Sequence, residues 1–105
     1  MAFIFTDENF DKEALKEEKL VVVDFYADWC GPCKMLAPVV EELAEELKDE
    51  VKIGKLNVDN SPETAQAFRV MNIPTILFLK NGTEVDKVVG ALPKASLLEK
   101  INQHK

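Results

Sequence analysis

Cysteine, histidine and tryptophan are scarce in this sequence: its 105 residues include two, one and one of them. Long apolar runs are absent, since no stretch approaches the roughly 18 residues that a transmembrane helix needs. The net charge of −6 disfavours nucleic acids and anionic membranes as partners. The first residues lack the basic region and long apolar core of a secretory signal, although a mature chain that had lost its leader would look the same. We therefore expect one domain, residues 1–105, that is cytoplasmic and monomeric.

Both cysteines lie in one motif, WCGPC, at residues 29–33. Thiols three positions apart can close a disulfide within one turn of chain, but so short a ring stabilises a fold less than a long loop would. Because cytosolic thiols are normally reduced, a lone pair is typical of a catalytic or metal-binding site. Zinc usually takes four nitrogen or sulfur ligands. The only histidine, His104, is expected on the solvated surface, so we predict no metal site within one chain, although a dimer could supply four cysteines. Two inert buried thiols are the other alternative.

Strand and helix patterns alternate along the chain and predict an α/β fold. At residues 20–26 and 75–79, apolar residues occupy both the odd and the even positions, which predicts strands that are buried on both faces. Helices that cross between parallel strands lead us to expect a central mixed sheet of about five strands, flanked on both faces by four helices in the order βαβαβαββα. The other expected strands are at residues 3–5, 51–58 and 84–90, and the helices at residues 6–16, 33–48, 61–69 and 93–103.

Local signals mark the ends of several of these elements. Thr6 and Ser61 are expected to cap the helices that they precede. Asn81-Gly82 predicts a two-residue hairpin turn, and the charges at Asp86 and Lys87 suit the edge strand that follows. In the second helix, Pro38 predicts a kink. The outer side of that helix is expected to carry the glutamates at positions 41, 42, 45 and 46.

The cysteine motif follows the most apolar strand and opens a helix. Unpaired N–H groups and partial positive charge at a helix N-terminus favour a thiolate. Cys30, at the entrance, is therefore expected to be exposed and to attack, whereas Cys33 should be more buried. Gly31 allows a tight turn and the approach of a substrate, and Pro32 suits the first helical turn. Trp29 is expected to shield one side of the thiols and to offer apolar contact area.

Two charged residues lie within predicted apolar strands. Asp24 alternates with Val22 and Tyr26 and cannot easily face water, so burial should raise its pKa. From the residues alone, it is either a structural acid with a local hydrogen bond or a functional acid. Lys55 is most simply interpreted as a surface lysine.

Motifs spaced along nearly the whole chain resemble those of the thioredoxin family. They are WCGPCK at residues 29–34, Asp24-Phe25-Tyr26-Ala27, Pro38, Asn57-Val58-Asp59, Ile73-Pro74-Thr75, Asn81-Gly82 and Gly90-Ala91. The resemblance implies the thioredoxin fold. It also implies a protein-disulfide reductase and electron carrier that needs no bound cofactor. Its implied partners are disulfide-containing target proteins and a thioredoxin reductase.

The resemblance also implies roles for individual residues. Cys30 would be the nucleophile, Cys33 the resolving cysteine and Asp24 the group that deprotonates Cys33. Lys55 would neighbour Asp24 and modulate its charge, and the dipeptide Gly31-Pro32 would tune the redox potential. Pro74 would follow a cis peptide bond, although most such bonds are trans. Substrate would dock on an apolar patch around Cys30, formed by Trp29, Gly31, Pro32, Ile73, Pro74, Gly90 and Ala91.

Two other functions stay open at this point. One is an oxidant or isomerase of the same fold, which a histidine in place of Pro32 would have favoured. The other is a non-catalytic interaction module that uses the same apolar patch, although binding alone would not require Cys30, Cys33 and Asp24. Residues 69–72, Arg-Val-Met-Asn, stand where many relatives have glycine or other small residues, so the preferred targets and reductase stay open.

Overall fold

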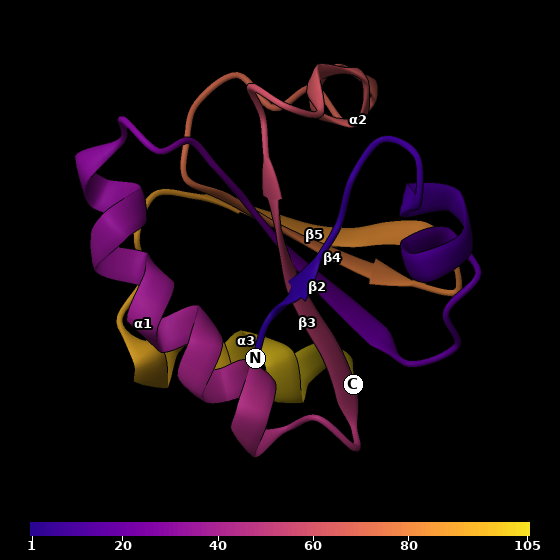
Figure 1. Cartoon of the computed structure of the whole chain (residues 1–105). Coiled ribbons are helices and arrows are strands. Elements are labelled where there is room, and N and C mark those ends of the chain that lie inside the picture. Colours follow the sequence, from indigo (N-terminus) through magenta and orange to yellow (C-terminus); the bar gives the residue numbers. More distant parts are fainter.

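The computed structural model describes all residues, Met1 to Lys105. A five-stranded sheet crosses the middle of the molecule, with helices on both faces (Figure 1). The order of the elements confirms the predicted βαβαβαββα arrangement. They are β1 (Phe3–Ile4), η1 (Asp11–Leu15), β2 (Leu20–Tyr26), α1 (Gly31–Glu46), β3 (Val51–Asn57), α2 (Pro62–Ala67), β4 (Thr75–Lys80), β5 (Thr83–Val89) and α3 (Lys94–His104).

β2 lies at the centre of the sheet, whose strand order is β1-β3-β2-β4-β5. It pairs in parallel with β3 and antiparallel with β4. Helices cover both faces of this central strand, which explains why the residues on both faces are mostly apolar. Val21 and Val23 pack into a core with η1 and α2, whereas Leu20 and Val22 pack into a second core with α1 and α3. Because side chains alternate along a strand, Asp24 belongs to the face that α1 covers.

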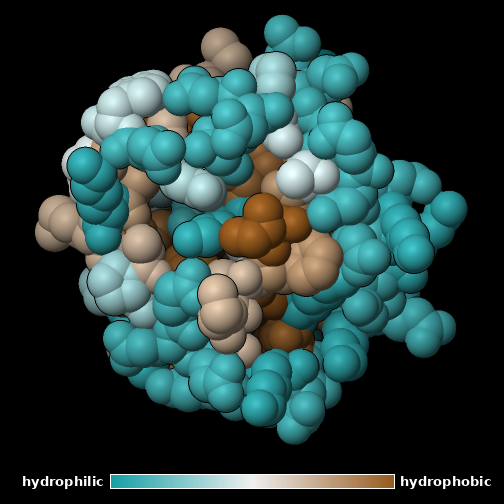
Figure 2. All heavy atoms as spheres, in the orientation of Figure 1, coloured by the Kyte–Doolittle hydropathy of each residue, from teal (hydrophilic) through white to brown (hydrophobic).

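The two helical layers are visible in Figure 1, with α1 and α3 on one side of the sheet and η1 and α2 on the other. Figure 2 shows that this view of the molecule is mostly hydrophilic, with apolar residues gathered near the place where Figure 1 puts β1. The exposed apolar residues of this edge include Met1 and Ile4. None of the helices combines the length and the apolar character that crossing a bilayer requires.

The first helical segment is shorter than predicted. Residues 6–16 were expected to form a helix, but the structure has turns followed by a short π-helix, η1, over Asp11–Leu15. Thr6 and Asn9 exchange two hydrogen bonds: the Asn9 N–H donates to Thr6 Oγ1 at 3.1 Å, and the Thr6 N–H donates to Asn9 Oδ1 at 2.8 Å. The pair has the form of a capping box, and the Phe10 N–H donates to the Thr6 carbonyl at 3.0 Å, so Thr6 caps a helical turn as predicted, although the regular helical segment is only η1.

α2 begins where predicted, with Ser61 at the N-cap position and Pro62 as its first residue, but the Ser61 side chain does not cap it. The Ser61 side chain makes no bond to α2 and instead accepts a hydrogen bond from the Asp7 N–H at 3.1 Å. Asp7 takes its place, because its carboxylate accepts from the N–H groups of Glu63 and Thr64 at 3.1 and 2.8 Å. At the other end, α2 stops at Ala67, since Arg69 adopts a left-handed backbone conformation with φ of 55°.

Several expectations for turns, strands and helices elsewhere in the chain are confirmed. Asn81 and Gly82 both have positive φ, 53° and 79°, as the predicted hairpin turn requires. β5 lies at the edge of the sheet. α1 starts two residues before Cys33 and continues through Pro38 to Glu46.

Two surface expectations are wrong. His104 is largely buried, because its Nε2 lies 2.9 Å from Asp86 Oδ2 and its ring packs near Phe78. Glu41 does not lie on the outer, solvated side of α1. It bonds to the backbone of Ala2 and pairs with Lys55 of β3. In both cases the side chain pairs with a polar group of a distant element instead of pointing into solvent.

Candidate active site

The two cysteines are joined by a disulfide where β2 leads into α1, with their Cα atoms 5.3 Å apart. Cys30 occupies the N-cap position of α1, and the Cys33 N–H donates a hydrogen bond to Cys30 Sγ at 3.2 Å. The sulfur therefore takes the place that a serine or aspartate oxygen usually has at a helix start. Its position at the positive end of a 16-residue helix favours negative charge on Cys30 once the disulfide is reduced.

Cys30 is less exposed than the sequence led us to expect. Its exposed fraction is 5 %, against 3 % for Cys33, so both residues are buried and the predicted difference is small. Ala27 clusters with the two cysteines, and Ile73 packs against this cluster. Because little of Cys30 is exposed, the surrounding surface is important for the access of a partner.

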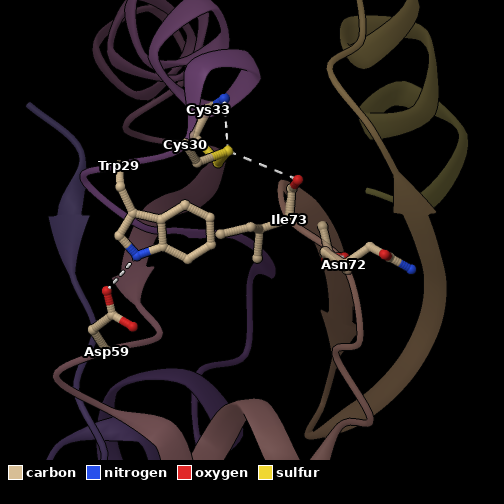
Figure 3. Close-up of a disulfide and its surroundings, with 7 residues drawn as sticks. Trp29, Cys30, Cys33, Asp59, Asn72 and Ile73 are labelled. Carbon is tan, nitrogen blue, oxygen red and sulfur yellow. Dashed lines mark hydrogen bonds between the residues drawn. A yellow bond between two sulfur atoms is a disulfide. The ribbon is translucent and has the colours of Figure 1, made fainter.

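The loop between α2 and β4 lies against the disulfide. The Ile73 carbonyl oxygen is 3.8 Å from Cys30 Sγ and points toward it (Figure 3). The Ile73–Pro74 peptide bond is cis, as the resemblance implied. The Gly90 N–H donates to the Pro74 carbonyl at 2.8 Å, and Gly90 has φ of 104°, a conformation that favours glycine. These contacts bring Ile73, Pro74 and Gly90, which are distant in sequence, to one side of Cys30.

Trp29 extends the surface beside the disulfide. Its exposed fraction is 72 %, and its indole N–H donates to Asp59 Oδ2 at 2.9 Å, which orients the ring (Figure 3). Asp59 belongs to the motif Asn57-Val58-Asp59, but no role was predicted for its side chain. No local signal could have found it, because the two residues are 30 positions apart. Trp29 offers apolar area, as predicted.

The remaining residues of the predicted patch are exposed, apart from the buried Pro74 and the partly buried Ile73 and Gly90. Gly31 is the first residue of α1 and has no left-handed φ, so a tight turn does not explain the glycine. A Cβ atom at this position would meet nothing within 4 Å, and this open space leaves room for a substrate. Met71 and Asn72, which directly precede Ile73, are exposed.

Asp24 lies beneath this surface in β2 with an exposed fraction of 3 %. Its Oδ1 atom is buried and has no hydrogen-bond partner. Burial raises the pKa of Asp24 from an ordinary value of 3.8 to about 7, although the positive charge of Lys55 works in the opposite direction. The local hydrogen bond expected of a structural acid is missing at Oδ1, and the carboxyl can exchange a proton near neutral pH.

Lys55 is next to Asp24 in the register of β2 and β3, which confirms the neighbour that the resemblance implied. It is not a simple surface lysine, because 29 % of its side chain is exposed and its Nζ lies 3.5 Å from Glu41 Oε2. A cavity of about 210 Å³ opens beside it and is also lined by Cys33 and Tyr26. The resolving cysteine and Lys55 therefore border the same solvent-accessible space. No group of three or more metal-ligating side chains is present.

Comparison with known proteins agrees with this geometry. A model of the family described as Thioredoxin matches residues 1–103. The chain is 49 % identical over 102 residues to Thioredoxin 2 of Chlorobaculum tepidum, covering 97 % of this chain and 94 % of that protein. It is 44 % identical over 104 residues to Thioredoxin 1 of Synechococcus elongatus, covering 99 % and 97 % of the two chains. The chain belongs to the thioredoxin family.

Membership of the thioredoxin family accounts for the fold and the cysteine pair together. The chain has the thioredoxin fold and the activity of a thiol–disulfide oxidoreductase that reduces protein disulfides. A further relative, Thioredoxin M-type of Pisum sativum, is chloroplastic, and is 46 % identical over 101 residues, covering 96 % of this chain and 59 % of that protein. Family membership therefore does not by itself assign a compartment.

Proposed function

We propose that Cys30 is the nucleophile, Cys33 the resolving cysteine and Asp24 the proton acceptor of this protein-disulfide reductase. The hydrogen bond from the Cys33 N–H to Cys30 Sγ carries the assignment, because it stabilises negative charge on Cys30 at the start of α1. Cys33 lies one turn inside the helix and receives no such bond to its sulfur. The two thiols are therefore unequal before any substrate binds.

In the first step, the Cys30 thiolate attacks one sulfur of a target disulfide. A Cys30–target bond forms, the target disulfide breaks, and one target thiolate leaves. In the second step, Cys33 loses its proton and its thiolate attacks Cys30 Sγ. The Cys30–Cys33 disulfide forms, and the second target thiolate leaves. Two electrons have passed to the target, and an external donor must reduce the protein again.

Asp24 is suited to accept the proton of Cys33 because its pKa lies near 7. A general base works best when its pKa is close to the operating pH. Lys55 and Cys33 border one cavity, which gives the proton a route to solvent on the side away from the docked target. Burial without a partner at Oδ1 costs stability, and a function in proton transfer explains why the chain carries that cost.

The exposed surface formed by Trp29, Gly31 and Pro32 on one side, and by Ile73 and Ala91 on the other, is the proposed docking site for targets. The Ile73 carbonyl could accept a hydrogen bond from the backbone of an extended target segment, in the manner of an added β-strand. The proposed partners are disulfide-containing proteins and a thioredoxin reductase. Reduction of targets requires a reducing compartment, and we propose that the protein acts as a monomer in the cytoplasm.

The test is to trap the intermediate with the Cys33→Ser variant. Without a resolving thiol, the reduced variant should stay attached to an oxidised target such as insulin through Cys30, and intact-protein mass spectrometry should detect the adduct. The double variant Cys30→Ser with Cys33→Ser is the matched control and should capture nothing. If the single variant also forms no adduct, Cys30 is not the nucleophile.

A further inference from the structure

Lys55 is the nearest positive charge to Asp24, yet its ion pair is with a different carboxylate. Its Nζ lies 3.5 Å from Oε2 of Glu41, on α1, and it makes no ion pair with Asp24. Asp24 and Lys55 are register partners in the neighbouring strands β2 and β3, so the two side chains begin side by side. The Lys55 ammonium nevertheless pairs with Glu41 and not with Asp24. Glu41 and Asp24 therefore compete for one cation.

Burial is the main cause of the raised pKa of Asp24, and Lys55 is the one neighbouring charge that opposes it. On the opposite side, β4 pairs Ile76 with Asp24 and adds no charge. From β2 itself the nearest titratable side chain is Tyr26, whose ring lies 5.6 Å from Lys55 Nζ. From α1 come Cys33, which is held in the disulfide, and Glu41. Glu41 pairs with Lys55, the one charged group that lowers the pKa of Asp24.

Glu41 is itself held in place by a second bond. Its Oε1 accepts a hydrogen bond from the Ala2 N–H at 2.8 Å, which leaves Oε2 for Lys55. The bond from Ala2, opposed by partial burial and assisted by Lys55, lowers the pKa of Glu41. Glu41 therefore stays ionised wherever the site is active. The Glu41 carboxylate of α1 thus contacts both Ala2, which precedes β1, and Lys55 of β3.

We propose that Glu41 is a positioning residue that holds the Lys55 ammonium away from Asp24 and thereby sets the strength of Asp24 as a proton acceptor. The proposal rests on the function proposed above for Asp24. Without the Glu41 charge, the ammonium would turn toward the remaining carboxylate, Asp24. An opposite charge within about 4 to 6 Å lowers the pKa of an aspartate by about 1 to 3. Asp24 would then bind protons more weakly, and Cys33 would lose its proton less readily.

The substitution Glu41→Gln tests this directly. The amide oxygen can still accept the Ala2 N–H, so the fold is kept while the charge is removed. Glu42→Gln is the matched control, because Glu42 is the next residue of the same helix and pairs instead with Lys94, at 3.0 Å. The Asp24 side-chain carboxyl is titrated by ¹³C NMR in the oxidised protein, where no thiol titrates. We expect its midpoint to fall by about 1 pH unit in Glu41→Gln and to stay unchanged in Glu42→Gln.

A double-mutant cycle with Lys55→Met shows whether the effect passes through the lysine. In the Lys55→Met background, Glu41→Gln should no longer move the Asp24 midpoint, because there is no ammonium to release. A merely structural role of Glu41 would instead change thermal stability and leave the midpoint where it was. An Asp24 midpoint that is the same in Glu41→Gln and in the parent overturns the proposal. The proposal is also overturned if Glu41→Gln shifts the Asp24 midpoint equally in the parent and in the Lys55→Met background.

The same variants separate this proposal from the proposed function. If the Asp24 midpoint shifts as expected, the pH dependence of mixed-disulfide resolution by Cys33 should shift with it. A shifted midpoint with an unchanged pH dependence would leave Glu41 as the residue that positions Lys55, but would remove Asp24 as the proton acceptor.

Discussion

Two aspartates of this protein are in opposite situations. At the start of α2, Asp7 accepts three hydrogen bonds, from the N–H groups of Glu63 and Thr64 and from the Thr64 hydroxyl. Burial works in the other direction, but these bonds lower the pKa of Asp7. In the central strand β2, Asp24 is buried, its Oδ1 has no partner, and its pKa rises to about 7. The same side chain is stabilising in one place and costly in the other.

The caps of the two helices differ as well. The N–H groups at the start of α2 are capped by the Asp7 carboxylate, which forms no covalent bond. At α1 the Cys33 N–H is capped by the Cys30 sulfur, which gains and loses a covalent bond in each proposed cycle. Asp24 Oδ1 has no hydrogen-bond partner of any kind, so no bond holds this carboxyl in its charged form. Fixed hydrogen bonds stabilise Asp7 and α2, whereas the groups of the candidate site are left able to react.

The largest expected effect is the loss of activity in Cys30→Ser. Serine is a favoured N-cap residue, so its hydroxyl should replace the sulfur as acceptor and α1 should keep its stability. The nucleophile is removed, and reduction of insulin by dithiothreitol should fall to the uncatalysed rate. Thermal unfolding of the reduced proteins provides the control, since variant and parent should differ by less than about 1 kcal/mol. Residual catalysis would mean that Cys30 is not the attacking residue.

Asp24→Asn should change both the rate and the pH dependence of stability. The pKa of Asp24 is raised above its value of 3.8 in an unfolded chain, so the parent loses stability as the pH rises from about 4 to 7. Asparagine never ionises, so the variant should lack that loss. The stability difference between the two proteins should therefore grow by about 4 kcal/mol over this range, measured by denaturant unfolding.

In the same variant, resolution of the mixed disulfide near neutral pH should slow by about 10²-fold, because the general base is gone. Stopped-flow measurement of target release checks this. Equal release rates in variant and parent would leave Asp24 a purely structural residue, whatever the stability curves show.

Asp7→Ala should have the smallest effect, on stability alone. Loss of an N-cap costs about 1 kcal/mol, which corresponds to a fall in Tm of about 4 to 8 °C for a domain of this size. The lowered pKa means that this contribution is present above the unfolded pKa of 3.8 and is lost as the pH falls further. The control is Asp11→Ala, since the exposed pair of Asp11 with Lys16 contributes little. Equal Tm values for the two variants would show that Asp7 does not cap α2.

Much of the fold was predictable because its signals are local. The apolar runs of β2 and β4, the periodicity of α1 and the Asn81-Gly82 turn each depend on neighbouring residues, and each is confirmed. Several of the predictions that are wrong involve partners far away in the sequence. Ser61 has the right residue type for a cap, but Asp7 fills that role from 57 positions before Thr64. No pattern around Ser61 could have indicated this.

The candidate site divides in the same way. The sequence by itself determined the cysteine pair, its position after a central strand, and an aspartate that burial would keep protonatable, because these follow from spacing and alternation within single elements. Only the tertiary structure decided that Lys55 pairs with Glu41, that Asp59 orients Trp29, and that Cys30 is nearly as buried as Cys33. The physical reason is that charge pairing and burial depend on distances between elements, which the chain sets when the sheet and helices pack.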